Sequence, residues 1–395
     1  MNAGKRKALV VGGGVAGLSA AWWLAATGWR VTLVERAPDL RADGYMLGLS
    51  GPGYEVARRM ELLPRLRECE RHIEDNLYLA RDGSELLRIN YHDFLKGLEW
   101  ITLARPDLAT ALYEAIRTNP DVDIRFATEV ETFRDEGDAV SVRLRDGSAF
   151  SVDLLIGADG VRSATRSALF GESADHLVPL GYRMAAYQVS DPQGLGNDFL
   201  SYAEPGRMVE YYRLPQDKIA ALHIWCDEDA SFVSMERRKQ LLGEAFAGAH
   251  PDVIRRIALL GEQDDVLLDG LVMVDLPSWH KGRCLLLGDA AHCLTLVSGQ
   301  GAGMAMTSAC VLAEELARGD IAEALERHEA RLRPTITTLQ VRSRSTARWF
   351  VPRTDRAFAF RNAIMRWMPK WLLNRYFQRG IRSEVLAASS LRIEN

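Results

Sequence analysis

The sequence predicts an α/β fold, in which a Rossmann-like nucleotide-binding domain carries an inserted antiparallel-sheet domain and a helical C-terminal tail. Three observations predict this arrangement. The first 36 residues contain a buried-strand pattern, a glycine turn and a helix-forming run. Residues 174–280 alternate apolar and polar side chains in several short segments, as paired strands do. Residues 281–304 return to a buried strand that ends in glycine turns. The predicted divisions are residues 1–173 and 281–350 for the nucleotide-binding domain, the second part including a long helix, 174–280 for the inserted domain and 351–395 for the tail.

The nucleotide-binding domain begins with the segment KALVVGGGVAGLSAAWWLAATGWRVTLVER, residues 7–36. Its apolar run Ala8–Val11 predicts a buried parallel strand, and Leu18–Ala26 predicts a helix. Gly28 stands where a glycine commonly ends a helix. A second strand pattern, Val31–Val34, ends at Glu35. The segment therefore predicts a β-α-β unit.

The glycines of this segment have GxGxxG spacing, and each has a physical role. Gly12 allows a tight turn, Gly14 lets a pyrophosphate approach the backbone, and Gly17 lets the helix pack closely on the strand. The N–H groups and dipole of the helix N-terminus favour phosphate. Glu35 stands where a carboxylate accepts hydrogen bonds from ribose hydroxyls. Together these features predict a site for an adenine dinucleotide.

Length and composition exclude several classes of protein. The chain has 395 residues, five scattered cysteines without a CxxC pair, and a net charge of −4. These values predict two or three globular domains, reduced cysteines in a cytoplasmic protein, no metal site and no nucleic-acid partner. No apolar run is long enough to span a bilayer. The basic residues Lys5–Lys7 before an apolar run also suit a signal peptide, but glycines interrupt the run and no cleavage site follows it.

Residues 37–153 are expected to continue the first domain with interruptions. The glycine-rich segment Ala42–Pro52 predicts a loop near the ligand, and Tyr54–Glu68 predicts one amphipathic helix. Asp82–Gly83 between two strand patterns predicts a hairpin. Arg105 stands at the start of a predicted helix that ends near residue 117. Because a cation is disfavoured at a helix start, Arg105 is expected to face an anion or a polar ligand.

Two later segments place polar residues at the ends of predicted strands. LLIGADGVRSATR, residues 154–166, is a buried strand followed by a loop in which Asp159 is equally suited to a turn, an N-cap or a ligand contact. RCLLLGDAAHCLTLVSGQGAGM, residues 283–304, places Asp289 at a strand end, where ligands of open α/β sheets bind. The turn Gly299–Gly301 exposes backbone N–H groups at a helix start, which suits a developing anion.

Taken together, the first glycine turn with Glu35, the GADGVRSATR segment, and the GDAAH and GQG segments resemble the FAD-dependent class A monooxygenases, the aromatic-hydroxylase-like flavoproteins. The resemblance spans residues 7–310 and does not cover the tail. It implies a Rossmann-like FAD-binding domain, with FAD as the cofactor. It also implies that NAD(P)H is a transient co-substrate without a Rossmann domain of its own.

The resemblance further implies which residues contact FAD. Asp159 would contact both FAD and NAD(P)H, and Asp289 the ribityl and pyrophosphate part of FAD. Gly299–Gly301 would lie at the pyrimidine edge of the flavin, and Gly44–Gly48 would border the isoalloxazine. The complete set of implied cofactor-binding residues is Gly12, Gly14, Ala16, Gly17, Glu35, Arg36, Arg105, Asp159, Asp289, Gly299 and Gly301.

For the reaction, the resemblance implies that NAD(P)H reduces FAD and that oxygen adds at flavin C4a. The resulting hydroperoxide would hydroxylate an electron-rich, phenolic or polyketide-like small molecule. Leu296 stands where the family usually carries a proline that shapes the floor under the flavin, which leaves substrate geometry and full hydroxylase activity open. A flavin-dependent reductase or dehydrogenase of the same fold, and a non-catalytic flavoprotein that sequesters a reactive metabolite, remain alternatives. The sequence does not determine the substrate, the choice of NADH or NADPH, or the oligomeric state.

The inserted domain and the tail offer no assigned catalytic residue. Four polar residues on the predicted sheet are candidates for a base or a substrate contact, but each residue type more often has a structural role in such a strand: Tyr211, Tyr212, Arg213 and His223. His292 is interpreted as a packing residue at a helix start. The tail combines aromatic and basic residues, which suit a cap over the active site, the favoured interpretation, or contact with an anionic membrane surface.

Overall fold

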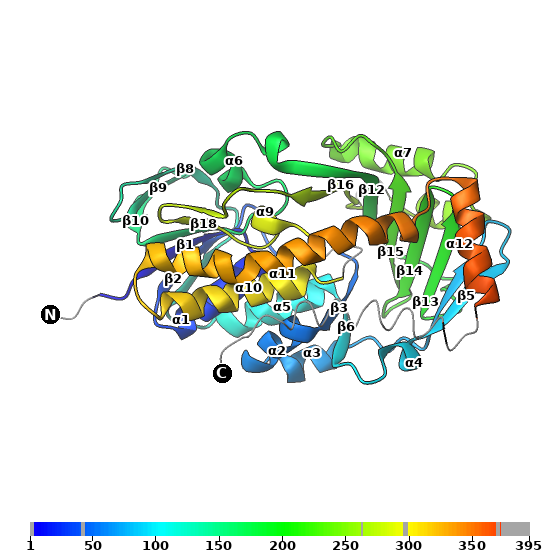
Figure 1. The fold of residues 1–395 in the computed structure, drawn as a ribbon, viewed down its shortest axis with the longest axis horizontal. Coiled ribbons are helices and arrows are strands. Elements are labelled where there is room, and N and C mark those ends of the chain that lie inside the picture. Colours follow the sequence, from blue (N-terminus) through cyan, green and yellow to red (C-terminus); the bar gives the residue numbers. More distant parts are fainter. Residues whose placement is uncertain (1–3, 41–43, 262–263, 295–298, 369–371, 373–395) are drawn as a thin grey trace.

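The computed structural model describes residues 4–40, 44–261, 264–294, 299–368 and 372, and its first sheet carries the predicted β-α-β unit (Figure 1). This sheet has six strands in the order β17-β18-β11-β1-β2-β7, and the neighbours from β18 to β7 are parallel. Its members are β1 (Lys7–Val11), β2 (Arg30–Val34), β7 (Val122–Arg125), β11 (Leu154–Gly157), β17 (His280–Lys281) and β18 (Cys284–Leu286). The sheet confirms the predicted α/β class. The three loops that follow β1, β11 and β18 also lie together, at the carboxyl ends of these parallel strands.

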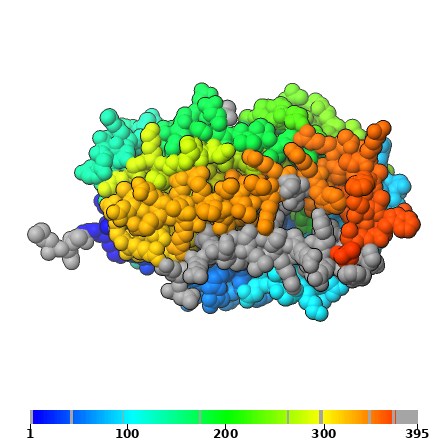
Figure 2. Space-filling view, viewed as in Figure 1, coloured from blue at the N-terminus to red at the C-terminus, as the bar shows by residue number. Residues whose placement is uncertain are grey.

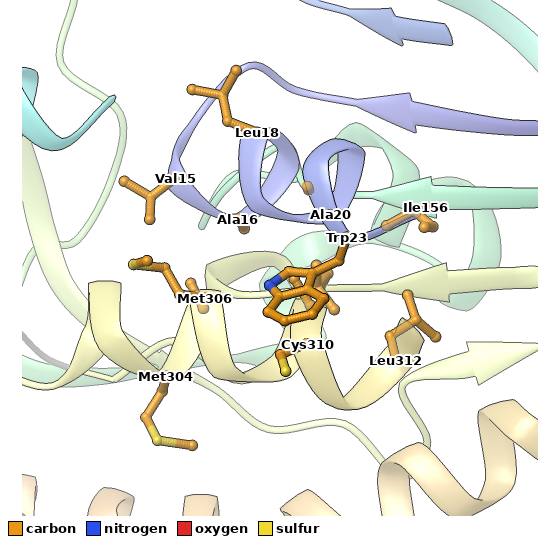
Figure 3. Packing of buried hydrophobic residues seen from close by; sticks show 14 of the residues in the cluster. Val15, Ala16, Leu18, Ala20, Trp23, Ile156, Met304, Met306, Cys310 and Leu312 are labelled. Carbon is orange, nitrogen blue, oxygen red and sulfur yellow. The ribbon is translucent and has the colours of Figure 1, made fainter. Parts of the chain in front are cut away.

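Two helices that begin at glycine turns of this domain pack against each other. Helix α1 (Val15–Ala26) packs against α10 (Gly301–Leu316). Figure 3 shows Trp23 of α1 turned toward α10, where Met306 and Cys310 lie in the same buried cluster. Removing a large buried side chain of this kind costs about 3–5 kcal/mol. The predicted helix end is confirmed, because Gly28 follows α1 with a φ of +89°.

The second sheet has seven strands in the order β16-β12-β15-β14-β13-β4-β5. Its members are β4 (Asp75–Leu79), β5 (Glu85–Asn90), β12 (Leu177–Ser190), β13 (Phe199–Glu204), β14 (Arg207–Arg213), β15 (Lys218–Cys226) and β16 (Leu267–Val274). Helices α7 (Met235–Ala245) and α8 (Pro251–Ala258) contribute to the core on one face. The sequence predicts the antiparallel strands of residues 177–274 and the β4–β5 hairpin separately. It does not predict that β4 pairs in parallel with β13, a contact between distant parts of the chain.

The prediction of a loop over Ala42–Pro52 is wrong in its second half. Strand β3 (Met46–Ser50) pairs antiparallel with β6 (Trp100–Ala104). A Cβ on Gly48 would lie 1.8 Å from the indole ring of Trp100, so the missing side chain makes room for that ring. A glycine in a strand often marks the close approach of another group. Here the glycines made a strand resemble a loop in the sequence.

The prediction of one helix over Tyr54–Glu68 is also wrong. The structure has α2 (Gly51–Arg59) and α3 (Leu63–Glu68). Glu61 lies between them with a φ of +58°, which a continuous α-helix of L-residues does not contain. The amphipathic pattern therefore continues across a turn that changes the direction of the chain.

The remaining elements complete the two layers. Around the nucleotide-binding part lie α5 (Arg105–Ile116), α6 (Ala164–Phe170), α9 (Asp289–His292), η1 (Ser173–His176) and a small sheet of β8 (Val130–Asp135), β9 (Val140–Leu144) and β10 (Ala149–Val152). Helix α4 (Tyr91–Leu95) follows β5. Helix α11 (Ile321–Phe350) runs along one face of the molecule from the first sheet to the second (Figures 1 and 2).

The described part of the tail covers the seven-stranded sheet. Helix α12 (Asp355–Trp367) places Phe358 against the buried cluster that contains Met184 and Met208. The Arg361 guanidinium donates to the carbonyl oxygen of Phe350 at 2.8 Å. This packing favours the interpretation of the tail as a cap. The rest of the tail, except residue 372, lies outside the described residues.

Candidate functional site

The first glycine turn has the geometry that its spacing predicts. Gly12 has a φ of +109°, and its N–H donates to the carbonyl oxygen of Val34 at 2.8 Å. A Cβ on Gly12 would lie 2.5 Å from the carbonyl oxygen of Ala158, and a Cβ on Gly17 would lie 1.9 Å from that of Gly12. A Cβ on Gly14 would meet no atom within 4 Å. Packing therefore requires two of the glycines, whereas the third borders open space, on the side where the sequence predicts a pyrophosphate.

The start of α1 is suited to an anion. Gly14 is its N-cap, and the helix has neither a side-chain cap nor an acidic residue in its first turn. The N–H groups at that end are therefore available to a phosphate. Glu35 braces the same loop, because it accepts from the N–H of Gly13 at 2.6 Å and from that of Ala37 at 2.9 Å. Its predicted contact with a ribose stays a prediction, as does the contact of the exposed Arg36 with the cofactor.

Asp159 holds the start of α6. Its carboxylate accepts from the hydroxyl group of Ser163, and from the N–H and hydroxyl groups of Thr165 at 2.9 and 3.0 Å. Ser163 in turn caps α6 by accepting from the N–H of Arg166 at 2.8 Å. The structural role that the sequence left open for Asp159 is therefore present. Its contacts with FAD and NAD(P)H stay a prediction.

Arg166 links the second motif to the third, a role that the sequence analysis did not assign. Its side chain is fully buried. The guanidinium donates to the carbonyl oxygen of Ala290 at 3.0 Å and to that of Val161 at 2.6 Å. Burial lowers the pKa of Arg166, while the nearby Asp159 opposes that change. The arginine thus fixes the loop after β11 against α9, which begins at Asp289.

Asp289 is the first residue of α9, in the segment that follows β18. Burial raises the pKa of its carboxyl group, and the opposing effects come from the charge of Arg105 and a hydrogen bond with Cys293. Yet the Asp289 residue is exposed. The carboxyl group is therefore packed among protein groups but keeps some accessible surface. A Cβ added to Gly288 would lie 2.8 Å from the Cβ atom of Ala16 in α1. The loop that contains Gly288 therefore packs closely on the start of α1.

Tyr45 and Arg105 lie near Asp289, because their electrostatic effects reach one another. The N–H of Arg105 donates to the carbonyl oxygen of Tyr45 at 3.0 Å. Burial raises the pKa of the Tyr45 hydroxyl to about 12, and the charges of Arg105 and Asp289 both act on it. The sequence predicts that Arg105 faces a polar or anionic group, and the structure brings its charge near Asp289. Tyr45 was missed, since it lies in the segment that the sequence assigned to a loop.

The turn Gly299–Gly301 leads into α10. A Cβ on Gly299 would meet no atom within 4 Å, and the nearest atom to one on Gly301 would be 3.9 Å away. Gln300 is buried and donates through Nε2 to the hydroxyl oxygen of Ser50 at 3.3 Å. This contact places the turn beside the end of β3. Leu296, which stands at the family's proline position, lies outside the described residues.

The three loops fit one extended dinucleotide such as FAD. They follow β1, β11 and β18, which are successive parallel neighbours, so they emerge at one edge of the sheet. Gly14 supplies open backbone at a helix start, Asp289 an accessible acid, and Gly299 a second open turn. Open backbone turns and an accessible acid are features that a dinucleotide site requires, and the part of the cofactor that each one contacts stays a prediction.

On the seven-stranded sheet, two of the four candidate residues belong to the core with α7 and α8. Tyr211 is in that core, and His223 is fully buried beside Phe246, with ring centroids 4.5 Å apart. The Nε2 atom of His223 lies 3.1 Å from the hydroxyl oxygen of Tyr187. Burial lowers the pKa of His223 to about 3, so the ring is neutral and structural.

The other two candidates differ from each other. Arg213 is exposed and forms a 3.6 Å ion pair with Asp198. Tyr212 lies on the opposite face of the sheet from Tyr211 and packs in a cluster with Met46 of β3 and Ala104 of β6. The structure therefore brings only Tyr212, of the four candidates, to the face that meets the nucleotide-binding part.

Glu210 is the main residue of this face that the sequence analysis missed. It lies two positions before Tyr212 on β14, and the Tyr212 hydroxyl donates to its Oε2 atom at 2.8 Å. Burial raises the pKa of the Glu210 carboxyl group to about 7, and the hydrogen bond from Tyr212 opposes that rise. The available signal was an acid inside an apolar strand, RMVEYYR, where a carboxyl group is expected to be buried.

His292 has the packing role that the sequence interpretation gave it. It is buried with its ring 4.7 Å from that of Trp279, and burial lowers its pKa to about 4. The five cysteines are free. In the part of the chain that the structure describes, no cluster of His, Cys, Asp and Glu is suited to a metal ion. Over the same residues, every helix is too short or too polar to cross a bilayer.

Comparisons with known sequences agree with this geometry. The FAD binding domain family matches residues 5–325. The FAD-dependent monooxygenase asL4 of Sarocladium schorii is 32% identical over 342 residues, which cover 80% of this chain and 78% of the relative. A flavin-dependent monooxygenase of Legionella longbeachae is 28% identical over 344 residues, covering 85% of this chain and 87% of the relative.

Solved structures share the whole fold. The tetracycline destructase Tet(51) has a TM-score of 0.82 at 22% identity and covers 99% of this chain and 100% of its own. Klebsiella pneumoniae HpxO, complexed with FAD and uric acid, has a TM-score of 0.79 at 22% identity, with 97% of each chain covered. At such identity the likeness concerns the fold, and it confirms the arrangement of a nucleotide-binding part with a second sheet.

Proposed function

We propose that this chain, which belongs to the FAD binding domain family and is an FAD-dependent monooxygenase, hydroxylates an electron-rich phenolic or polyketide-like small molecule. The co-substrates are O2 and NAD(P)H. The observation that carries the proposal is the sheet face beside the nucleotide-binding part, where aromatic rings surround one buried carboxyl group. The proposed place of action is the cytoplasm, where thiols stay reduced.

The cofactor-binding residues divide the work along the FAD molecule. Gly14 and the start of α1 would hold the pyrophosphate, and Glu35 the adenosine ribose. Asp289 would bind hydroxyl groups of the ribityl chain. The turn Gly299–Gly301 would donate backbone N–H groups to the edge of the ring, where they stabilise negative charge. When bound, FAD supplies the redox chemistry: it accepts a hydride from NAD(P)H and delivers one atom of O2 to the substrate.

The chemistry of the sheet face supports an aromatic substrate. The rings of Phe199 and Tyr212 lie 4.1 Å apart between centroids, and those of Phe199 and Tyr91 lie 6.0 Å apart. Met46 of β3 belongs to the same apolar cluster, whose members are largely buried by the protein itself. A flat ring gains dispersion and hydrophobic energy on such a surface. The apolar walls would also exclude water from the reacting carbon atom, which an oxygen transfer requires.

NAD(P)H is proposed to bind transiently. The chain contains one GxGxxG segment, residues 12–17, and the resemblance assigns that segment to FAD. A reductant that reacts and leaves needs no second site of that kind. Comparing the rates of flavin reduction by NADH and by NADPH under anaerobic conditions would identify the preferred donor.

The test uses the purified holoenzyme with NADPH or NADH in air. The probes are a series of phenols from 4-methylphenol to 4-nitrophenol, and the fused-ring phenol 1-naphthol. We expect at least one phenol to stimulate NAD(P)H oxidation and to yield a product that carries isotopically labelled oxygen from O2. Oxidation of NAD(P)H without labelled product from any of these phenols would overturn the phenolic substrate class.

A further inference from the structure

Glu210 lies in the middle of β14, on the face that meets the nucleotide-binding part. Side chains alternate along a strand, so Met208, Glu210 and Tyr212 share a face, while Val209 and Tyr211 join the core with α7 and α8. Residue 210 pairs with residues 201 and 222 of the neighbouring strands. It is therefore a central position of the sheet, one step from the contact with β3.

The Glu210 carboxyl group has one anchored oxygen and one that no described residue occupies. Tyr212 donates to Oε2 at 2.8 Å. Of the residues that the structure describes, none other hydrogen-bonds the Glu210 side chain, although the residue is only 8% exposed. Oε1 does not belong to the fully buried side-chain oxygens that lack a partner, so it keeps accessible surface. A ligand with a hydrogen-bond donor can therefore reach Oε1.

No cation in the described ranges of the chain forms an ion pair with Glu210. Tyr78 of β4, Tyr91 of α4 and Tyr212 of the same strand lie near it. Burial raises the pKa of all three hydroxyl groups, and the charge of Glu210 raises each of them further. Among the residues that the structure describes, the cation that acts on these tyrosines is Arg361 of α12, and its effect is on Tyr78. Burial without an opposite charge accounts for the pKa of about 7 at Glu210.

Aromatic rings border the same carboxyl group. Tyr212 follows it on the strand and contacts Phe199, which in turn lies near Tyr91. A phenol that stacks on this surface presents its hydroxyl group at the ring edge, in the plane of the ring. That hydroxyl group is the donor that Oε1 lacks.

We propose that Glu210 accepts the proton of the substrate's phenolic hydroxyl group, and that Tyr212 orients the carboxylate for this transfer. This inference rests on the proposed function. In the step, the phenolic O–H bond breaks, an O–H bond forms at Oε1, and the electron pair stays on the phenol oxygen. The charged oxygen makes the ortho and para carbon atoms more nucleophilic toward the oxygen atom that the monooxygenase reaction delivers.

The proton then returns, so the step is balanced over the reaction. After oxygen transfer, the carbon atom that gained oxygen still carries its hydrogen, and the original oxygen is a carbonyl. That carbon loses its proton to solvent, aromaticity is restored, and Glu210 returns its proton to the original oxygen. The carboxylate is again in its starting state.

The test compares the pH profiles of wild type and Glu210→Gln for hydroxylation of the same phenols. In the wild type we expect kcat/KM to fall below about pH 7, where the carboxylate becomes protonated. With 4-methylphenol, Glu210→Gln should lower kcat by about 10²–10⁴-fold and abolish the fall of kcat/KM at low pH, which we call the acidic limb. The ratio of wild-type to variant rate should shrink for 4-nitrophenol, because a more acidic phenol ionises with less help.

Two tyrosine variants provide matched controls. Tyr212→Phe should keep the acidic limb of the kcat/KM profile but shift it to higher pH, because the hydrogen bond from Tyr212 lowers the pKa of Glu210. Tyr211→Phe makes the same chemical change on the other face and should leave the profile unchanged. Flavin content and circular dichroism would establish that each variant is folded.

Three outcomes would overturn the inference. A Glu210→Gln enzyme with the wild-type profile would remove the role of Glu210 while leaving the phenolic substrate class intact. A flavin-loaded Glu210→Gln enzyme that loses the same fraction of activity with every phenol at every pH would show a structural role. If the wild type hydroxylates no phenol, the proposed function fails first and this inference with it.

Discussion

Tyr211 and Tyr212 are neighbours on β14, yet they point to opposite faces of the seven-stranded sheet and serve different surroundings. The face of Tyr211, which we call the closed face, packs on α7 and α8 and contains His223. The face of Tyr212, which we call the open face, meets β3 and β6 and contains Glu210. Both faces bury a titratable group, so burial alone does not distinguish them.

The difference lies in the sign of the desolvation effect. Burial disfavours the charged form of any group. It lowers the pKa of His223 to about 3, far from neutral pH, and raises that of Glu210 to about 7. In an apolar sheet, a buried carboxyl group therefore acquires the proton affinity of a useful base, whereas a buried imidazole loses it. This is the physical reason why His223, the more familiar base, is the structural residue here.

The largest expected effect comes from opening the closed face. Phe246 is 2% exposed and packs edge-on against His223. Phe246→Ala should lower the free energy of unfolding by about 3–5 kcal/mol, because it leaves a cavity in a packed core. Urea unfolding measures this change. The folded variant should retain its flavin, and loss of flavin at full folding would show that the two faces are not independent.

The next effect concerns pH and the open face. The folded pKa of Glu210, about 7, is higher than the value of 4.5 for a free side chain, so its contribution to stability is full below about pH 4 and is lost as pH rises through 7. Near pH 8, burying the carboxylate costs about 3 kcal/mol as an upper bound. The stability difference between Glu210→Gln and wild type should therefore grow in favour of the variant from about pH 5 to about pH 8. Urea unfolding at several pH values measures it, and parallel curves would contradict the pKa shift.

A smaller effect is expected at the polar contact of the closed face. Tyr187→Phe removes the hydroxyl group beside Nε2 of His223 and leaves a buried polar atom without that partner. The expected loss is about 2 kcal/mol of unfolding free energy. Thermal unfolding measures it, and the kcat/KM profile of the variant should match the wild type. A changed profile would place this face in the catalytic machinery.

The smallest effect on stability comes from the two neighbouring tyrosines. Tyr211→Phe and Tyr212→Phe should each change the unfolding free energy by about 1 kcal/mol. Their effects on activity should differ, since only Tyr212 holds Glu210. Equal pH profiles for the two variants would erase the functional distinction between the faces.

Much of the nucleotide site could be predicted from local sequence. The roles of Gly12 and Gly17 follow from a turn and a helix contact within a short segment, and the structure shows the close approaches that exclude a side chain at both. Asp289 could be predicted from its place after a buried strand, because parallel strands bring their loops to one edge. The errors at residues 42–52 and 54–68 arose where glycines or a continuous apolar pattern concealed a change of direction.

The sequence by itself determined which side chains share a face of β14, since alternation has a fixed period of two. It did not determine which face meets the nucleotide-binding part, because the period is the same whichever layer covers each side. That choice depends on contacts between distant segments. β3 lies beside Tyr212, the β4–β5 hairpin pairs with β13, and α12 packs on that hairpin. Only the tertiary structure buried Glu210 among aromatic residues, and that burial raises its pKa toward neutral pH.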